Sequence, residues 1–439
     1  MAAVALAPAD AGGGAGVTPQ RELLARLFRA AVAAADPLKV LPGHLPERPR
    51  GRTVVVGAGK GAAQMAAAFD RLWDAPVSGL VVTRYGYGCD AGRIEVAEAA
   101  HPVPDAAGLA SAERLLGLVS GLGEDDLVVA LICGGGSALL PAPPGGMTLA
   151  DEAEVTRALL RSGAPISEMN LIRKHLSRIK GGRLAAAAHP ARVVTLAVSD
   201  IPGDDPAAIA SGPTVPGPGT LAEARAVVAR RELALPAAAR EWLAREEAAA
   251  PRPGDDGFAR DEVRVIASAR LSLEAAAAAA EAEGVSAAIL SDAVEGEARE
   301  VARVHAALAR EVALRGRPFA APVVLLSGGE TTVTVRGEGR GGRNAEFALS
   351  AARDLAGLSG VHLLAADTDG IDGTEDNAGA FADGATWGRL REAGRDPAAA
   401  LAENDAWGAF EALGDLFVTG PTGVNVNDFR ALLVEAGAT

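Results

Sequence analysis

Short apolar strands that run directly into glycine-rich loops constrain the fold of this chain more than any other feature. Such runs cover residues 53–56, 127–132, 193–198 and 361–366, and a loop of glycines and polar residues follows each one. Stretches with the apolar spacing of a helix separate the first three runs. Alternating strands and helices predict an α/β fold with a doubly wound parallel sheet, in which ligands bind at the carboxyl ends of the strands.

The length of the chain predicts two domains, because 439 residues exceed what one ordinary hydrophobic core holds. The segment PRPGDDG, residues 251–257, is typical of an exposed linker. We therefore expect a disordered leader over residues 1–19, an N-terminal domain over 20–252 and a smaller C-terminal α/β domain over 257–439.

The net charge of −14 argues against nucleic acid or an anionic membrane surface as the main partner. No apolar run approaches the ~20 residues that a membrane span requires. Cys89 and Cys133 lie far apart and lack metal-ligand spacing, which is typical of a reducing compartment. We expect a cytoplasmic homodimer that binds small molecules. Cys133 is either a nucleophile or a small buried residue that ends a strand.

The first loop, GAGKG, has the form of an anion-binding turn between a strand and a helix. Gly57, Gly59 and Ala62 satisfy the dinucleotide pattern GxGxxG/A. The next strand, however, ends in threonine and arginine instead of the acidic residue that would hold a ribose. Lys60 places a positive charge where a phosphate or carboxylate would lie. The alternative interpretation is a solvated lysine in a turn.

The second and third loops contribute further polar groups. The second predicts an anion cradle, with Ser137 as helix N-cap or phosphate donor, formed by Gly134, Gly135, Gly136 and Ser137. In the third, Asp200 or Asp204 can accept a proton from a substrate hydroxyl or hold a metal, or can merely cap a turn. Three polar or glycine positions follow: Ser211, Gly212 and Thr214.

Residues 166–188 concentrate positive charge in an otherwise acidic chain. The basic residues are Arg173, Lys174, His175, Arg178, Lys180 and Arg183. We interpret the segment as one helix that ends at the glycine pair 181–182. Its cations either bind an anion or only complement the helix dipole.

The last third of the chain holds an arginine loop and an acidic loop. Arg343 lies among glycines at a predicted helix start, where an arginine is suited to clamp phosphate or carboxylate, and Asn344 can cap that helix. Residues 323–335 predict a β-hairpin. The acidic loop, residues 367–383, predicts a divalent cation, a basic side chain or a catalytic proton acceptor among its carboxylates, which are Asp367, Asp369, Asp372, Glu375 and Asp376.

Together these groups form the inventory that phosphoryl transfer requires. Lys60, Arg343 and the triple-glycine loop offer positive charge and amides, while two aspartates, Asp204 and Asp369, offer hard oxygen ligands or a base. The residues themselves leave open which aspartate is the base and which the metal ligand.

Seven motifs in this order resemble the glycerate 2-kinases of the MOFRL type: GAGKGAAQM, CGGGSALL, NLIRKHLSRIKGGRLA, SDIPGDDPAAIASGPT, GGRNAEFAL, DTDGIDGTEDNAGA and GPTGVNVND. The resemblance covers nearly the whole chain from about Gln20. It implies ATP-dependent phosphorylation of D-glycerate at its 2-hydroxyl with Mg2+. It also implies a Rossmann-like N-terminal domain, a smaller C-terminal domain and an active-site cleft between them.

With this resemblance, the expected site residues fall into four groups. The catalytic residues are Lys60, Asp204, Arg343 and Asp369. Those expected to bind ATP are Gly57, Gly59, Gly134, Gly135, Gly136, Ser137, Ser211, Gly212 and Thr214. Those expected to bind D-glycerate are Lys60, Arg173, Lys180, Arg343, Asn344 and Asn425. The expected metal ligands are Asp200, Asp204 and Asp369.

Two other functions stay open. An NAD(P)H-dependent hydroxypyruvate reductase fits the GxGxxA turn, but the ribose-binding acid and an obvious His/Asp pair for hydride transfer are missing from the sequence. A non-catalytic sensor of sugar acids or nucleotides is the third. One departure from the family pattern, Ala269 where relatives often carry asparagine, puts a single loop contact in doubt.

Overall fold

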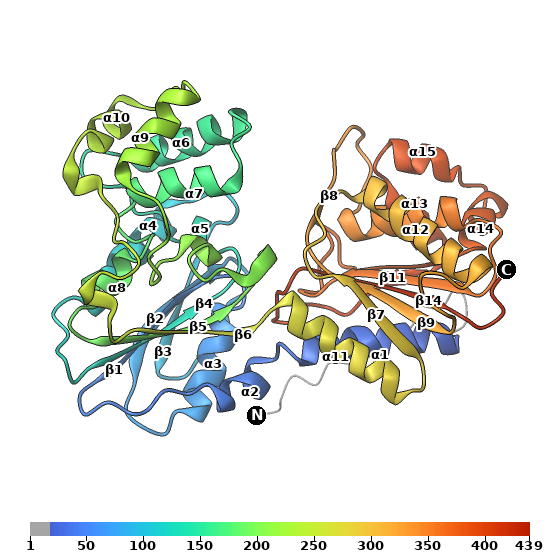
Figure 1. Ribbon diagram of the computed structural model, residues 1–439, viewed down its shortest axis with the longest axis horizontal. Coiled ribbons are helices and arrows are strands. Elements are labelled where there is room, and N and C mark those ends of the chain that lie inside the picture. The colour runs from blue at the N-terminus through green and yellow to red at the C-terminus, as the bar shows by residue number, and fades with distance from the viewer. Residues whose placement is uncertain (1–17) are drawn as a thin grey trace. The chain divides into compact units, whose positions relative to one another are not determined.

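The computed structural model describes residues 18–439, which form two compact units (Figure 1). The first unit comprises Pro37–Ile266, and the second comprises the chain up to Asp36 together with Ala267–Thr439. We expected residues 20–36 in the first domain and a boundary at 252–257, so the structure divides the chain differently at both points. Residues 1–17 of the expected leader lie outside the described part of the chain.

The first unit is built on a six-stranded sheet with the strand order β3-β2-β1-β4-β5-β6. The pairs from β3 through β5 are parallel, which confirms the predicted doubly wound α/β fold. In this strand order, ligands bind where the order reverses, between β1 and β4. The strands are β1 (Thr53–Ala58), β2 (Ser78–Arg84), β3 (Ile94–Ala99), β4 (Leu127–Ile132), β5 (Arg192–Val198) and β6 (Glu262–Ala267).

Helices cover both faces of this sheet (Figure 1). On one face, α4 and α8 share a buried core with the strands that includes Val56, Leu115 and Ala185. On the other face, α3 packs against β1, β2 and β4. The α-helices of the unit are α2 (Pro37–Val40), α3 (Ala62–Leu72), α4 (Ala106–Val119), α5 (Gly136–Leu139), α6 (Leu149–Arg161), α7 (Ile166–His175), α8 (Arg183–Ala188), α9 (Leu221–Arg230) and α10 (Ala237–Leu243).

A second, purely helical core joins α6, α7, α9 and α10, with Val155, Ile172 and Val227 at its centre. Both α6 and α9 begin with a capping box, in which a threonine and an acidic residue three positions later satisfy each other's backbone amides. Short 3-10 turns complete the unit: η1 (Leu41–Gly43), η2 (Pro202–Asp204), η3 (Ile209–Ser211), η4 (Glu246–Ala248) and η5 (Asp256–Phe258).

The prediction of one helix from residue 166 to the glycine pair 181–182 was wrong. The segment forms α7 and α8, and Gly182 is the N-cap of α8 instead of a C-cap. The N–H groups of Gly181 and Gly182 donate to the carbonyls of Ser211 and Gly212, at 3.0 and 2.7 Å. These bonds tie the break between the helices to the loop after β5.

The second unit has a mixed sheet of order β13-β12-β11-β14-β9-β7. β14 is antiparallel to both β11 and β9, whereas β7 is parallel to β9. The strands are β7 (Ser286–Ser291), β8 (Gly296–Glu297), β9 (Val323–Ser327), β10 (Thr331–Thr332), β11 (Val361–Asp367), β12 (Gly379–Asp383), β13 (Leu416–Phe417) and β14 (Asp428–Val434).

Helices enclose this sheet from both sides, with α12 and α13 on one face and α1 and α11 on the other (Figure 1). The α-helices are α1 (Pro19–Ala33), α11 (Ala269–Ala282), α12 (Ala298–Arg315), α13 (Arg343–Leu355), α14 (Thr386–Glu392), α15 (Pro397–Ala402) and α16 (Ala406–Leu413).

The predicted hairpin over residues 323–335 does not form. Instead, β10 pairs in parallel with β8, which lies 35 residues earlier in the chain. Gly328 donates its N–H to Ser291 and accepts from Val294, at 2.8 and 3.1 Å. These bonds hold the turn after β9 against the loop after β7, so the chain cannot fold back onto β9.

Aromatic packing explains why α1 belongs to the second unit. The buried ring of Phe28 makes edge contacts with Phe417 and Phe429, at centroid distances of 5.1 and 5.7 Å. Arg21 adds an ion pair of 2.6 Å to the buried carboxylate of Asp415. These partners lie about 390 residues along the chain, so nothing local in the sequence indicates them.

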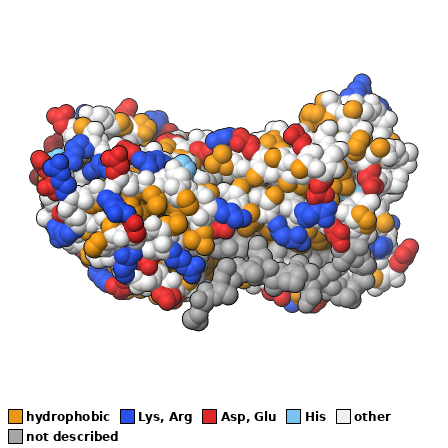
Figure 2. Space-filling model, turned by 90° about the horizontal axis from the view of Figure 1, so that it is seen from below, with side chains coloured by type: hydrophobic (Ala, Val, Ile, Leu, Met, Phe, Trp, Pro, Cys, Tyr) orange, Lys and Arg blue, Asp and Glu red, His pale blue; other side chains and the backbone are white. Residues whose placement is uncertain are grey.

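No helix within residues 18–439 is both long and apolar enough to cross a membrane. On the face that Figure 2 presents, basic and acidic side chains are interspersed, and neither sign gathers into one continuous surface.

Candidate active site

The backbone N–H groups of the turn after β1 already donate hydrogen bonds to other parts of the protein. The N–H of Lys60 donates to the carbonyl of Gly134 at 2.8 Å, and the N–H of Gly61 donates to the sulfur of Cys133 at 3.2 Å. The N–H of Gly59 bonds to a β2 carbonyl at 3.1 Å. This turn therefore does not offer the amide cradle that its GxGxxA pattern predicts.

The glycines of this turn are required for packing. A β-carbon at Gly59 would lie 2.3 Å from the sulfur of Cys133, and one at Gly57 would lie 2.3 Å from the carbonyl oxygen of Leu131. Gly57 and Gly59 thus allow β1 and its turn to approach β4 closely, and their expected role in ATP binding stays a prediction.

The loop after β4 keeps backbone amides available. The N–H groups of Gly134 and Gly135 donate to no residue in the described chain, in contrast to those of the first turn. The side chain of Lys60 lies over this loop, because a β-carbon at Gly135 would come within 3.3 Å of Lys60 Cγ and 3.1 Å of His101 Nε2. Gly136 approaches the backbone of β1 too closely for a side chain, with Ala58 O 3.0 Å from its ideal β-carbon.

Ser137 is not the helix N-cap, because Gly135 occupies that position of α5. The Ser137 hydroxyl instead lies 2.8 Å from the hydroxyl of Ser211, in the loop after β5. The structure thus brings together two of the serine hydroxyls that the sequence singled out.

A cavity of about 240 Å³ opens beside the loop after β4. Its polar lining consists of His101, Ser137, Glu152, Thr156, Arg173 and Lys180, and apolar side chains such as Val155 and Leu176 complete it. All of these residues belong to the first unit. The cavity therefore joins the loop after β4 to α6 and α7.

The charged side chains of the cavity leave one cation without a direct partner. Lys180 Nζ lies 3.0 Å from Glu152 Oε1, and both side chains are almost buried. Arg173 donates no hydrogen bond to any described residue, and burial lowers the pKa of its guanidinium, an effect that the charge of Glu152 opposes. Arg173 is partly buried, and a partly buried cation without a direct partner favours the binding of an anion.

The other basic residues of this segment have structural partners. Lys174 donates to three successive backbone carbonyls, and Arg183 donates to two. Arg178 pairs with Glu113. Of the six basic residues, only Arg173 and Lys180 line the cavity, and these are the two that we predicted to bind substrate.

His101 and Glu152 are cavity residues that sequence reasoning missed. Burial, followed by the charges of Lys60 and Arg84, lowers the pKa of His101 to about 4, so its imidazole is neutral at pH 7. Its place in the loop after β3, at the carboxyl edge of the sheet, was a signal that could have found it. Glu152 gave no local signal, because Lys180 lies 28 residues away.

The loop after β5 contributes two carboxylates near the turns. The charges of Asp200 and Lys60 both act on the thiol of Cys133, so the two groups lie near it. Burial raises the pKa of Cys133 to about 12, which argues for a packing residue and against a nucleophile. Asp204, partly exposed in η2, has a left-handed backbone with φ of 53°.

Two expected ATP-binding residues of this loop have structural roles. The N–H of Gly212 donates to the Ile209 carbonyl at 2.8 Å, and a β-carbon there would lie 2.5 Å from the Ala207 carbonyl oxygen. The buried hydroxyl of Thr214 pairs with that of Thr195 at 2.8 Å. Gly212 closes a turn within the loop, and Thr214 fixes the loop to β5.

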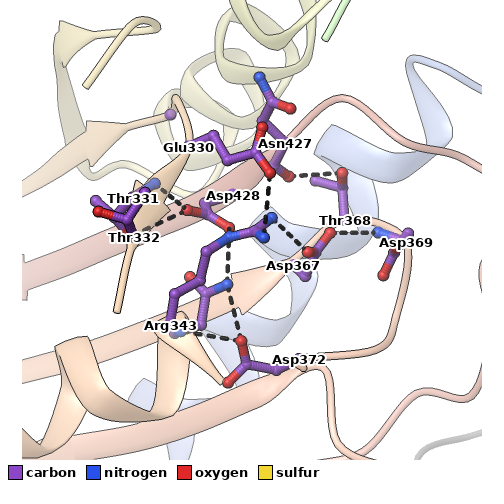
Figure 3. Close-up of polar contacts among 12 residues, drawn as sticks. Glu330, Thr331, Thr332, Arg343, Asp367, Thr368, Asp369, Asp372, Asn427 and Asp428 are labelled. Carbon is purple, nitrogen blue, oxygen red and sulfur yellow. Dashed lines mark hydrogen bonds and ion pairs between the residues drawn. The ribbon is translucent and has the colours of Figure 1, made fainter. Parts of the chain in front are cut away.

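In the second unit, Arg343 is held by three carboxylates (Figure 3). Its guanidinium lies 2.7 Å from Asp367 and from Asp428, and 3.2 Å from Glu330. Its side chain is about one-fifth exposed. Burial lowers the pKa of Arg343, but these carboxylates outweigh burial and raise it. Arg343 is therefore a partnered cation, whereas the sequence indicated an unpaired clamp for phosphate.

The carboxylates around Arg343 differ in their electrostatics. Burial raises the pKa of Asp367 well above its usual value, and the neighbouring charge of Asp369 adds to this rise. Burial also raises the pKa of Asp428, but Arg430 and Arg343 outweigh it and lower the pKa. Arg430 is itself fully buried and pairs with Asp428.

Asn344 is not the cap of α13, because Gly342 is the N-cap residue. Asp372, across the acidic loop, accepts the N–H groups of Asn344 and Ala345 at 3.0 and 2.8 Å. The Asn344 side chain is fully buried and donates to Asp428 at 2.8 Å. Asn344 thus has a structural role at the start of α13, and its expected contact with substrate stays a prediction.

The remaining predicted residues of this unit are also buried. Asn425 accepts the N–H of Asn427 at 3.4 Å, and Asp369 accepts the N–H of Ile371 at 2.9 Å. In residues 18–439, no group of three or more His, Cys, Asp or Glu side chains is arranged to hold a metal ion. The carboxylates of each unit therefore do not form a complete metal site by themselves.

Two family models match the sequence. Residues 23–244 match a domain of unknown function, DUF4147, and residues 323–428 match the MOFRL family. The first match falls almost entirely on the first unit and the second on the second unit.

Several curated proteins match nearly the whole chain. A protein of Agrobacterium vitis named as a hydroxypyruvate reductase is 56% identical, with 94% of each chain covered. The glycerate 2-kinase of Pyrococcus horikoshii is 39% identical, with 94% of this chain and 97% of that protein covered. The D-glycerate 2-kinase of Thermotoga maritima is also 39% identical, with 93% and 97% covered.

The fold matches a solved structure as well. The crystal structure of glycerate kinase from Thermotoga maritima superposes with a TM-score of 0.86 at 38% identity, covering 94% of this chain and 99% of that one. The sequence and the fold agree over both units, and the chain belongs to the MOFRL-type glycerate 2-kinase family.

Proposed function

We propose that this protein transfers the γ-phosphoryl group of ATP to the 2-hydroxyl of D-glycerate, giving 2-phosphoglycerate and ADP. The cavity of the first unit carries the proposal. Lys180 is balanced by Glu152 and His101 is neutral, so Arg173 leaves the cavity with one uncompensated positive charge. One net positive charge in about 240 Å³ suits a small acid with a single carboxylate.

The groups beside the cavity support phosphoryl transfer. In this proposal the carboxylate of glycerate pairs with Arg173, and Lys60 neutralises the transferred phosphoryl group. The N–H groups of Gly134 and Gly135 are donors for phosphate oxygens, which is the electrostatic stabilisation on which this chemistry depends. Asp204 accepts the proton of the reacting hydroxyl or binds the metal, and Asp200 stands beside it in the same loop.

Magnesium enters this proposal bound to ATP. Asp200 and Asp204, in the loop after β5, provide hard oxygen ligands, and no group of three carboxylates there is arranged for a metal held by protein alone in the described residues. Mg2+ commonly binds through one or two carboxylates together with substrate phosphates. Asp200 and Asp204 fit this pattern.

Reduction of hydroxypyruvate is the second candidate, because a 56% identical relative carries that name. The geometry of the turn after β1 argues against it. A dinucleotide requires amides from this turn for its pyrophosphate, and those of Gly59, Lys60 and Gly61 already have partners.

Two parallel assays separate these functions. Purified protein is incubated with D-glycerate, ATP and Mg2+ while ADP is measured, and separately with hydroxypyruvate and NADH or NADPH while absorbance at the nicotinamide band is followed. The proposal predicts ADP formation that depends on D-glycerate, and no oxidation of either nicotinamide. Oxidation of NADH or NADPH without ADP formation would establish the reductase.

The proposal includes a cytoplasmic location. Both cysteines are unbonded thiols, one exposed and one buried, which supports a reducing compartment.

A further inference from the structure

Glu152 has a buried oxygen atom that no group in the described chain satisfies. Its Oε1 pairs with Lys180, but its Oε2 is shielded from solvent and has no hydrogen-bond partner. Glu152 lines the cavity of the first unit, together with Arg173. A buried carboxylate oxygen without a donor is costly, so this position favours a ligand that brings an O–H or N–H group.

The ion pair with Lys180 determines what kind of donor suits Glu152. The ammonium group of Lys180 occupies one oxygen of Glu152 and leaves the other as a hydrogen-bond acceptor. That oxygen suits a hydroxyl group of the ligand, whereas the hydroxyl that is deprotonated during phosphoryl transfer is assigned to the loop after β5 in the proposed function.

The cavity thus offers two distinct contacts to one small molecule. Arg173 suits a carboxylate, and Glu152 suits a hydroxyl of the same molecule. We propose that Glu152 accepts a hydrogen bond from the hydroxyl group that is not phosphorylated, and that this contact selects dihydroxy acids over monohydroxy acids. The inference rests on the proposed function, in which the 2-hydroxyl of D-glycerate reacts and the 3-hydroxyl is left for Glu152.

Binding of two ligands in the absence of nucleotide tests this proposal. D-glycerate and D-lactate share a carboxylate and a 2-hydroxyl, and D-lactate lacks the 3-hydroxyl. Calorimetry on the full-length wild type is expected to show at least about tenfold tighter binding of D-glycerate, because D-lactate leaves the buried oxygen unsatisfied. In Glu152→Gln the preference should fall to about threefold or less, since a neutral amide is the weaker acceptor.

The matched control is Glu154→Gln, which changes an exposed glutamate on the same helix and should keep the wild-type preference. If Glu152→Gln leaves Lys180 without a partner and the variant does not fold, the double variant E152Q/K180Q keeps a neutral pair that can still hydrogen-bond. An undiminished preference in the folded variant would overturn the proposal, as would a wild type that binds both acids equally.

The experiments distinguish a failure of the Glu152 contact from a failure of the proposed kinase activity. Selective binding that depends on Glu152, without ATP-dependent phosphorylation, would refute the kinase and retain this contact. Phosphorylation with no loss of selectivity in Glu152→Gln would retain the kinase and refute the contact.

Discussion

Two residues of this protein show that a charged side chain in a glycine-rich loop does not by itself reveal what that side chain binds. Arg343 and Lys60 look alike in the sequence, because each lies among glycines at the start of a helix. Arg343 proves to be bound by Asp367, 24 residues away, and Asp428, 85 residues away. Partners at such distances have no local signature. The sequence therefore predicted a basic side chain among the acidic-loop carboxylates as one of three alternatives, but it did not identify Arg343 as that side chain.

The sequence identified two basic residues of the cavity correctly. Arg173 and Lys180 were singled out among six basic residues, and both line the cavity. Glu152 was missed, because only the fold brings α6 against the residues that follow α7. For Gly57 and Gly59 the structure shows a packing requirement that the sequence did not reveal, because a glycine needed for close packing and one needed for phosphate binding look identical in a sequence.

At the same scale, buried His305 should make folding stability depend on pH. Burial lowers its pKa to about 4, its Nδ1–H donates to the Val301 carbonyl, and its Nε2 accepts from the Ser327 hydroxyl. The unfolded chain, with an ordinary pKa near 6.5, takes up the proton first, so stability is lost as pH falls from about 6.5 towards 4. Between pH 6.5 and 5 the loss from this histidine should be about 2 kcal/mol.

Urea unfolding of the wild type and of His305→Gln between pH 5 and 7 measures this loss. The variant should show a shallower fall in the free energy of unfolding, by about 2 kcal/mol over the interval. His189→Gln, which changes an exposed histidine, is the control. Parallel curves for His305→Gln and the wild type would show that His305 does not titrate as described.

At the scale of elements, the sequence predicted most strands of the first sheet but not the pairing in the second. Apolar runs that end in glycine loops located β1, β4 and β5 because parallel strands buried on both faces are continuously apolar. The short strand β12, with the sequence GAFAD, carries no such run. The hairpin predicted over residues 323–335 failed because backbone bonds to the loop after β7 redirect the chain.

The start of α13 depends on a cap supplied from outside the helix. Asp372 accepts two backbone N–H groups there, and a β-carbon at Gly342 would lie 2.3 Å from one of its oxygens. Asp372→Ala should lower the free energy of unfolding by about 2 kcal/mol, because two buried amides lose their acceptor.

Chemical denaturation tests this prediction with Asp376→Ala as the matched control. Asp376 is exposed in the same loop, so its removal should change stability by less than about 0.5 kcal/mol. Equal stability of the two variants would mean that Asp372 does not cap α13.

At the scale of the whole molecule, the first helix folds with the last third of the chain. The sequence predicted two domains and their α/β class. The contacts of α1 group it with the second unit, whereas the prediction, like the DUF4147 match over residues 23–244, places it in the first domain. Hydrophobic periodicity identifies a helix and its buried face, and it carries no information about which sheet that face covers.

Phe28→Ala should therefore destabilise the second unit. Removing this buried ring from its contacts with Phe417 and Phe429 should cost about 3–5 kcal/mol. Hydrogen exchange should show faster opening of β11 and β14 with unchanged protection of β1 and β4. Faster exchange in β1 and β4, with β11 and β14 unchanged, would place α1 with the first sheet instead.

In the proposed function, phosphoryl transfer depends on Lys60 acting with the loop after β4. The most direct measurement is phosphorus NMR of the products formed from D-glycerate, ATP and Mg2+ by the wild type and by Lys60→Met, with Lys39→Met, an exposed lysine, as control. We expect 2-phosphoglycerate from the wild type and the control, and a rate at least about 100-fold lower from Lys60→Met with an unchanged melting temperature. Absence of phosphoglycerate from the wild type, or a normal rate from folded Lys60→Met, would contradict this account.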